Sequence, residues 1–308
     1  MRTVFVSGAS GFVGTAAVRE LLRRGHLVHA AVRSRDLRLN DARVTCFRGN
    51  LDDTTLLDRA LERCSAAIHL VGIIRENPGQ GVTFHRMHVD FTRAVVDACV
   101  RRGVQRYVHM SALRSHGDSL SLYHQTKAAA EQIVEASPLS WTILRPSLIH
   151  GADGEFVQML TRWAKGKAFP FFAMPYFGAG LLGRGPEHLV QPVSVDDVAW
   201  AIAEAIERPT TIGKRYDMGG AQRLSWREMY RTFSKALTGK VKRTLPVPTW
   251  YALLLTRILP AKLLPFDRGQ VIMSQQDNVA DMQPFEADFG RMPEGFADAL
   301  GRYVEGLK

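Results

Sequence analysis

Tyr123 and Lys127 stand four residues apart in the stretch Tyr-His-Gln-Thr-Lys, which opens an expected helix. Residues at this spacing share one face of a helix, so both side chains can reach one reaction centre. A free tyrosine has a pKa near ~10, and a neighbouring ammonium group favours its phenolate form. We therefore expect Tyr123 to transfer a proton to or from a carbonyl or carbinol oxygen, with Lys127 lowering its pKa. The alternative is a half-buried tyrosine beside a solvated lysine.

A hydroxyl group is expected close to this pair. Ser111 directly follows residues 106–110, the fifth expected strand. A hydroxyl at the end of that strand can polarise a substrate oxygen, and we assign this role to Ser111. Ala112 follows it, so the sequence places the catalytic hydroxyl only to within a residue or two.

The elements that would position these groups begin at the first residues of the chain. Residues 3–6 form an apolar, β-branched run that is typical of a strand buried on both faces. Gly8, Gly11 and Gly14 follow at intervals of three and lead into a helical pattern. A strand, a glycine-rich turn and a helix N-terminus form a phosphate site, because backbone N–H groups can approach a pyrophosphate there. The pattern favours dinucleotide binding over the alternative, a flexible turn.

Arg33 ends the second expected strand, 27–32, and Arg35 follows it. In a dinucleotide-binding fold this strand end meets the adenosine ribose, where a carboxylate would repel a 2′-phosphate. Two arginines favour NADP(H), with NAD(H) as the second cofactor and a solvated surface pair as the alternative. Asp52, after the third strand, is expected to accept from the adenine amino group, and Lys127 to hold the nicotinamide ribose. An oxidised nicotinamide is expected to lower the pKa of Tyr123 together with Lys127. The other residues expected around the cofactor are Ser10, Phe12, Val13, Leu70, Val71, Gly72 and Pro146.

The alternation of apolar strands and helices predicts parallel strands joined by right-handed crossovers. Five strands are expected, at 3–6, 27–32, 44–47, 66–71 and 106–110. We expect an α/β fold, a Rossmann-type doubly wound parallel sheet with a small C-terminal substrate lobe. Residues 1–150 form the expected NAD(P)-binding core and 151–308 mostly the second lobe, with 190–220 returning to the core.

The composition is that of a soluble protein with an unusual charge. The chain has 308 residues, is 46% hydrophobic, and carries a net charge of +10. No recognised nucleic-acid motif supports a nucleic-acid partner, so the charge points to anionic lipid or a phosphorylated cofactor. Its three cysteines have no paired spacing and indicate packed, reduced thiols in the cytoplasm. We see no signal peptide and no apolar run long enough to span a membrane.

Two later segments suggest apolar contacts. The segment 169–190 is rich in glycine, proline and aromatic residues, as in a mobile lid over an apolar ligand, although Phe171, Phe172, Tyr176 and Phe177 favour packing over specificity. Residues 235–268 contain seven Lys or Arg and one acid around the apolar runs 250–255 and 263–266. This pattern suits a membrane interface or a membrane-complex partner, and equally a buried helix with basic ends.

These motifs together resemble the extended and atypical short-chain dehydrogenase/reductases, and within them the branch of the nucleotide-binding accessory subunit of respiratory complex I. The resemblance rests on GASGFVG at 8–14, Ser111, YHQTK at 123–127, RPSLIHG at 145–151, QPVSVDDVA at 191–199, QDNV at 276–279, Phe285 and Pro293. It implies a Rossmann fold, a nicotinamide cofactor and a substrate lobe after residue 146. The complex I subunits are thought to bind NADPH structurally and often lack the Tyr/Lys pair, which this chain keeps.

The sequence departs from the family in two places. Ser7 stands where threonine is usual, and His88 stands where sugar-nucleotide epimerases and dehydratases usually carry asparagine. His85 and His88 have ligand-like spacing, but no nearby cysteine or carboxylate completes a metal set, so we interpret both as ordinary helix residues. Two functions follow: an oxidoreductase on an apolar carbonyl, alcohol or quinone, or a non-catalytic accessory or assembly protein of a membrane respiratory complex. A sugar-nucleotide epimerase or dehydratase is a weaker third. Each would be cytoplasmic, or peripheral to the inner face of a membrane.

Overall fold

The computed structural model describes residues 1–34, 36, 37, 39–259, 264 and 266–308. Its contacts divide the chain into two compact units. Unit 1 comprises Met1–Pro146, Val195–Met218 and Asp281–Arg291, and unit 2 comprises Ser147–Ser194, Gly219–Ala280 and Met292–Lys308. The first unit therefore draws on three separate stretches of sequence.

Unit 1 is built on one seven-stranded sheet in the order β11-β6-β5-β4-β1-β2-β3. Every neighbouring pair in it is parallel. This confirms the predicted doubly wound parallel sheet, and the five expected strands form with small changes at their ends. The strands are β1 Thr3–Ser7, β2 Leu27–Val32, β3 Val44–Arg48, β4 Ala66–His69, β5 Arg106–Met110, β6 Ser140–Pro146 and β11 Lys214–Met218.

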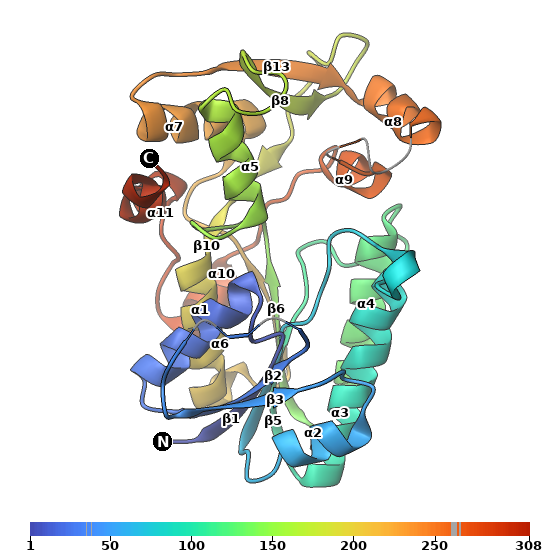
Figure 1. Ribbon diagram of the computed structural model, residues 1–308, viewed down its shortest axis with the longest axis vertical. Helices are drawn as coiled ribbons and strands as arrows, with labels where there is room; N and C mark the ends of the chain where they lie inside the picture. Colours follow the sequence, from blue (N-terminus) through green and yellow to red (C-terminus); the bar gives the residue numbers. More distant parts are fainter. Residues whose placement is uncertain (35, 38, 260–263, 265) are drawn as a thin grey trace. The chain divides into compact units, whose positions relative to one another are not determined.

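Helices cover both faces of this sheet (Figure 1). In that view α1 and α6 lie on one side, and α2, α3 and α4 lie on the other. Side chains alternate across each strand, so Phe5, Ala67 and Tyr107 share one core cluster with the residues of α2 and α3. The helices are α1 Phe12–Arg23, α2 Thr54–Ala60, α3 Phe91–Arg102, α4 Leu122–Glu135, α6 Val195–Glu207 and α10 Gln283–Phe289.

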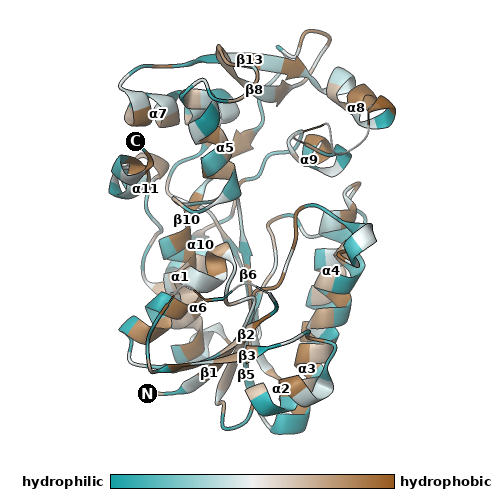
Figure 2. Ribbon diagram, in the orientation of Figure 1, coloured by the Kyte–Doolittle hydropathy of each residue, from teal (hydrophilic) through white to brown (hydrophobic). Residues whose placement is uncertain are grey.

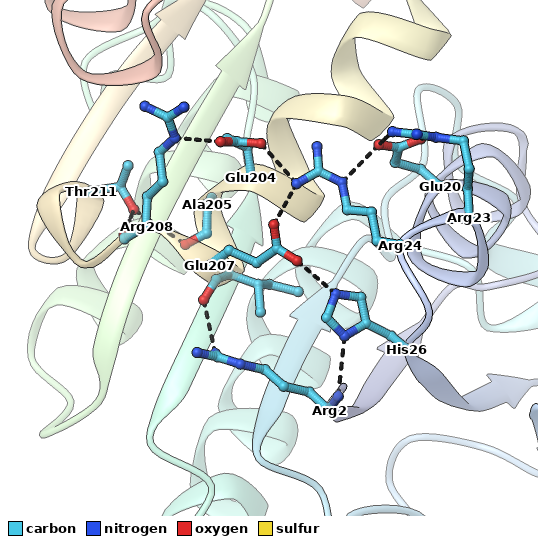
Figure 3. A network of polar contacts seen from close by, with 11 residues as sticks. Arg2, Glu20, Arg23, Arg24, His26, Glu204, Ala205, Glu207, Arg208 and Thr211 are labelled. Carbon is cyan, nitrogen blue, oxygen red and sulfur yellow. Dashed lines mark hydrogen bonds and ion pairs between the residues drawn. The ribbon is translucent and has the colours of Figure 1, made fainter.

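A network of charged side chains connects α6 to the C-terminal end of α1 and the residues that follow it (Figure 3). The Arg24 guanidinium, at the end of α1, contacts Glu204 at 2.7 Å and Glu207 at 2.6 Å, and also pairs with Glu20 of its own helix. His26 adds a contact to Glu207 at 2.9 Å. These contacts explain how residues 195–207 join the core from a distant part of the chain.

The helical stretch between β4 and β5 is not uniform. Residues His85–Asp90 form a π-helical turn, and the regular helix α3 begins only at Phe91. A π-helical turn widens the backbone by one residue and is frequent at functional sites. Here it places His88 in the interior while His85 stays exposed.

Unit 2 packs its helices around short strand pairs, with a core that includes Met174, Tyr176 and Phe233. Its β8 and β13 are parallel, and the pairs β7–β10 and β9–β12 are shorter. Its elements are β7 Ile149–His150, α5 Glu155–Ala164, β8 Ala173–Gly178, β9 Leu189–Val190, β10 Val193–Ser194, β12 Leu224–Ser225, α7 Trp226–Thr238, β13 Arg243–Pro248, α8 Thr249–Ile258, α9 Arg268–Met273 and α11 Phe296–Tyr303.

Two expectations about buried side chains are wrong. Tyr176 is buried, but Phe171 and Phe172 are 60% and 65% exposed, so they do not serve packing. The cysteines are free as expected, yet Cys46 is exposed because it lies on β3, the edge strand of the sheet. In the described part of the chain, no helix combines the length and apolar content needed to cross a bilayer.

Candidate functional site

The glycine-rich turn brings α1 directly against the end of β1. Gly8 has a φ of +72°, and a Cβ on it would lie 3.1 Å from the Leu70 carbonyl carbon. A Cβ on Gly14 would overlap the carbonyl oxygen of Gly8 and lie 2.8 Å from the Ala9 Cα. Only glycine fits both positions, because one needs a left-handed backbone and the other leaves no room for a side chain.

The N-terminus of α1 is arranged for an anion. Gly11 is the N-cap residue and provides no side-chain hydrogen bond, and the first turn carries no acidic residue. Its N–H groups and the positive end of the helix dipole are therefore directed at the turn. Ser10 and Phe12 are half-buried, whereas Val13 is buried, so Val13 can offer a ligand only its backbone.

The ends of β2 and β3 carry a second cation that the sequence interpretation missed. Arg33 is exposed after β2, whereas Arg35 lies outside the described residues. Arg48 ends β3 in register with Val32, donates to the Ser34 carbonyl oxygen at 3.5 Å and pairs with Asp36. The sequence could have indicated Arg48, because an arginine at the end of the third strand must lie beside the end of the second strand in a parallel sheet.

Asp52 lies exposed after β3, where an adenine ring was expected. Its Oδ2 pairs with the Arg86 guanidinium at 2.7 Å and accepts from the Asn50 side-chain amide at 3.2 Å. The carboxylate is thus held in place by groups from two elements of unit 1.

The end of β4 meets the Tyr/Lys helix. Leu70 is buried, and its N–H donates to the Ser7 carbonyl oxygen at 3.2 Å. Val71 is half-buried and packs against the core cluster. A Cβ on Gly72 would lie 3.0 Å from the Lys127 Nζ, so this glycine permits a close approach by the lysine.

Lys127 is buried on α4, and its Nζ donates to the Met110 carbonyl oxygen at 3.0 Å. Burial lowers the pKa of Lys127 to about 8, and the Glu131 carboxylate opposes this shift. Tyr123 is half-buried, and burial raises its pKa to about 12. Burial thus shifts the pKa of Tyr123 in the direction opposite to the lowering that is expected from Lys127 together with an oxidised nicotinamide.

The remaining predicted residues of the site lie at the ends of β5 and β6. Ser111 is buried, and its hydroxyl donates to the Ser115 hydroxyl at 3.3 Å. Pro146 ends β6, and its carbonyl oxygen accepts from the Leu113 N–H at 3.0 Å. Ser115 also lines a cavity of about 480 Å³ within unit 1, whose other walls include Glu131, Arg145 and Asp217. These walls are mostly polar, so the cavity does not have the lining expected of an apolar site.

His88, which the sequence analysis interpreted as an ordinary helix residue and not a metal ligand, lies beside Tyr123 and near the charge of Lys127. Its Nε2 accepts from the Ile73 N–H at 3.1 Å, and its Nδ1 lies 2.9 Å from the Thr126 Oγ1. Its ring meets the Tyr123 ring edge-on at 5.4 Å. Burial and the Lys127 charge lower the pKa of His88 to about 2, so it stays neutral and donates from Nδ1.

Two further histidines lie buried beside it. His69 and His109 are register partners on β4 and β5, and their rings stack at 5.6 Å. Burial lowers the pKa of His69 to about 3 and that of His109 well below its usual value, and the Lys127 charge adds to both shifts. Neither was predicted to be near the site, because a histidine inside a strand gives no local signal of what faces it.

Comparisons with known proteins agree with this geometry. The sequence model of a family described as NAD(P)H-binding matches residues 8–167. The mitochondrial "NADH dehydrogenase (ubiquinone) 1 alpha subcomplex subunit 9" of Dictyostelium discoideum is 27% identical over 253 residues, which cover 80% of this chain and 66% of that protein. The "Ceramide reductase" of Caulobacter vibrioides is 31% identical over 170 residues, covering 54% of this chain and 53% of that protein. The chain thus spans less than two thirds of the length of these relatives.

Among solved structures, "MoeE5 in complex with UDP-glucose and NAD" superposes with a TM-score of 0.73 at 22% identity, covering 98% of this chain and 97% of that one. This likeness shows the fold. The family match covers more than half of the chain and includes the glycine-rich turn, β4 and the Tyr/Lys helix, so the expectation of a nicotinamide cofactor is confirmed. The chain belongs to the NAD(P)H-binding family of proteins with the short-chain dehydrogenase/reductase type of Rossmann fold.

Proposed function

We propose that this protein is an NADP(H)-dependent oxidoreductase acting on an apolar carbonyl, alcohol or quinone. The observation that carries the proposal is the position of the Lys127 Nζ, which contacts the Met110 carbonyl oxygen and approaches Gly72. The Lys127 side chain thereby connects the helix that bears Tyr123 to the ends of β4 and β5. A parallel sheet binds its ligands at these strand ends.

Each group has a role that its surroundings support. The bound nicotinamide supplies or accepts the hydride. Lys127 holds the ribose, and Tyr123 exchanges a proton with the substrate oxygen that Ser111 polarises. With the pKa of Tyr123 at about 12, the phenol is protonated at neutral pH, which suits the direction in which a carbonyl is reduced. The name of the ceramide reductase relative supports an apolar lipid substrate.

The preference for NADP(H) is supported by two arginines at adjacent strand ends. Arg33 is exposed after β2, and Arg48 is fixed near it by the Ser34 carbonyl oxygen. A 2′-phosphate beside them would replace contacts that Arg48 now makes with Asp36. Guanidinium groups suit phosphate because they donate parallel hydrogen bonds.

Nucleotide titration tests the cofactor. NADPH and NADH are titrated into the wild type, Arg33→Ala, Arg48→Ala and the control Arg59→Ala, an exposed arginine of α2. We expect each of the first two variants to weaken NADPH about tenfold or more, as for one charge-assisted hydrogen bond, without affecting NADH. Equal affinity of the wild type for both nucleotides would contradict the preference.

Turnover is tested separately with a panel of quinones and apolar ketones. Oxidation of NADPH by the wild type and its loss in Tyr123→Phe, with NADPH affinity unchanged, is the expected result. Bound NADPH that reacts with no acceptor would support the second candidate function.

That second candidate is a non-catalytic, NADPH-loaded accessory or assembly protein of a membrane respiratory complex. It is favoured by the relatives that are named as NADH dehydrogenase subunits. In either function we place the protein in the cytoplasm, peripheral to the inner face of a membrane. Residues 235–268 are the proposed contact with the membrane or its complex.

A further inference from the structure

We propose that unit 2 docks onto an anionic phospholipid bilayer through one surface, formed by the described residues of the segments 156–186 and 235–266 and here called the lipid face. The inference rests on the peripheral location in the proposed function and names the partner as the lipid itself. It extends the contact beyond the C-terminal basic region to a second segment, 156–186, which overlaps the stretch 169–190 that the sequence analysis interpreted as a lid.

The charged side chains of the two segments are all positive. Neither contains an acidic residue, although the chain as a whole has 30 acids in 308 residues, which predicts roughly six in stretches of this length. Glu155, Glu187 and Asp267 directly flank the two segments; Glu155 lies in the first turn of α5, Glu187 pairs with Arg227, and Asp267 caps α9. The cations of the two segments are Arg162, Lys165, Lys167, Arg184, Lys235, Lys240, Lys242, Arg243, Arg257 and Lys262, the last of which lies outside the described residues.

The fold brings these distant segments together. β8 pairs in parallel with β13 from Ala173↔Arg243 to Gly178↔Pro248. At the start of this ribbon the Lys242 Nζ donates to the Phe171 carbonyl oxygen at 2.8 Å. Figure 1 shows the two strands side by side, with α8 following β13. The cations of both segments therefore add to one local potential.

Large apolar side chains project from both ends of the ribbon. Before β8, Phe171 and Phe172 are 60% and 65% exposed, and after it Leu181 and Leu182 are 77% and 67% exposed. The Trp250 indole N–H donates to the Leu181 carbonyl oxygen at 3.0 Å, which joins the second loop to α8.

Helix α8 lies at the surface of unit 2. The alternative given for residues 235–268, a buried helix with basic ends, therefore does not apply to α8. Ala252 is its only fully buried residue. Trp250, Tyr251, Leu254 and Ile258 are exposed, and Figure 2 colours parts of the helix as hydrophobic. Aromatic and aliphatic side chains flanked by cations are the composition of a segment that lies in a membrane interface.

A bilayer fits this surface better than a second copy of the chain. Two copies facing each other through the lipid face would bring like charges together, which opposes association. An anionic bilayer supplies the opposite charge along the ribbon and an apolar layer for the side chains at its ends.

Vesicle flotation of the full chain tests the proposal. The vesicles consist either of pure phosphatidylcholine or of phosphatidylcholine with ~30% phosphatidylglycerol, which is an anionic lipid. We compare wild type with the charge variant Lys240→Glu/Lys242→Glu/Arg243→Glu and the apolar variant Phe171→Ser/Phe172→Ser. The matched control, Arg59→Glu/Arg93→Glu/Arg102→Glu, makes the same change in net charge on exposed positions of α2 and α3 in unit 1.

The wild type and the matched control are expected to float with the anionic vesicles. For both lipid-face variants, the fraction of protein bound to these vesicles is expected to fall at least ~tenfold. The proposal would be overturned if the wild type did not bind the anionic vesicles, or if it bound both vesicle types equally well. It would also be overturned if the matched control lost as much binding as the lipid-face variants. NADPH affinity, measured in the same preparations without vesicles, reports on the cofactor site alone. Failure of the lipid face is thereby distinguished from failure of the proposed function.

Discussion

His88 and Thr126 are joined by a hydrogen bond of 2.9 Å between the imidazole Nδ1 and the hydroxyl Oγ1. The other ring nitrogen of His88 accepts from the Ile73 N–H, one residue after Gly72. One neutral side chain thus connects the loop after β4 to the helix that carries Tyr123 and Lys127. We regard His88 as a positioning residue for that helix.

Thr126→Val removes this bond with almost no change in volume. It leaves the His88 N–H buried without its acceptor, which costs about 1–3 kcal/mol of unfolding free energy. We also expect NADPH affinity to fall a few-fold, because the loop at Gly72 loses its support. Thr161→Val is the matched control, since the Thr161 hydroxyl bonds only within its own helix, to the Val157 carbonyl oxygen. Urea unfolding and nucleotide titration measure both effects, and identical losses in the two variants would disprove the positioning role.

Gly14→Ala is expected to abolish nucleotide binding or reduce it by more than about tenfold. The added Cβ overlaps the Gly8 carbonyl oxygen, so α1 must move away from the turn, and overpacking of this kind typically costs about 1–3 kcal/mol. Gly301→Ala is the control, because it is also helical but has open space around its Cβ. It should be neutral or slightly stabilising. Wild-type NADPH affinity in Gly14→Ala would show that the turn does not hold the nucleotide.

The buried histidines predict loss of stability in acid. Their folded-state pKa values lie below the ordinary 6.5, with His69 at about 3 and His88 at about 2, so the unfolded chain binds more protons as the pH falls below 6.5. Each such histidine lowers the free energy of unfolding by about 1.4 kcal/mol for each pH unit well below 6.5. Stability is fully retained above this range.

Urea unfolding at pH 7.5, 6.0 and 5.0 measures this slope. His109→Phe should make it shallower, because one buried titrating group is removed. The exposed His116 provides the control, since His116→Gln should leave the slope unchanged. A slope that His109→Phe does not alter would mean that this histidine becomes protonated without unfolding.

Glu131 and Arg145 form a buried ion pair on the wall of the unit 1 cavity, with the Arg145 Nε 2.9 Å from the Glu131 Oε1. Arg145→Met should cost about 3–5 kcal/mol, because it leaves the buried Glu131 carboxylate without its partner. Glu131→Gln should cost less, because the Arg145 side chain is 15% exposed and still lies 3.9 Å from Asp217. The double variant should recover most of this loss. A double-mutant cycle by chemical denaturation gives the coupling energy, and the exposed pair Asp58–Arg101 is the control, with less than about 1 kcal/mol expected. Additive losses at Glu131 and Arg145 would contradict the pairing.

The sequence by itself determined five of the seven strands of the sheet, the glycine-rich turn and the helix that bears Tyr123 and Lys127, but not β6 and β11. These features depend on local patterns, such as apolar runs, glycine spacing and helical periodicity, and each pattern lies within about twenty residues. The sequence analysis expected residues 190–220 to return to the core, and unit 1 contains Val195–Met218. Nothing in the pattern of 281–291 indicated that this stretch belongs to unit 1.

Only the tertiary structure decided what surrounds these residues. The bond between His88 and Thr126 spans 38 positions, and the stacking of His69 on His109 depends on the register of two strands. The pairing of β8 with β13 merged two acid-free segments into one surface. Long-range contacts of this kind leave no local pattern, because burial and charge at one position are set by whichever distant segment the fold places against it.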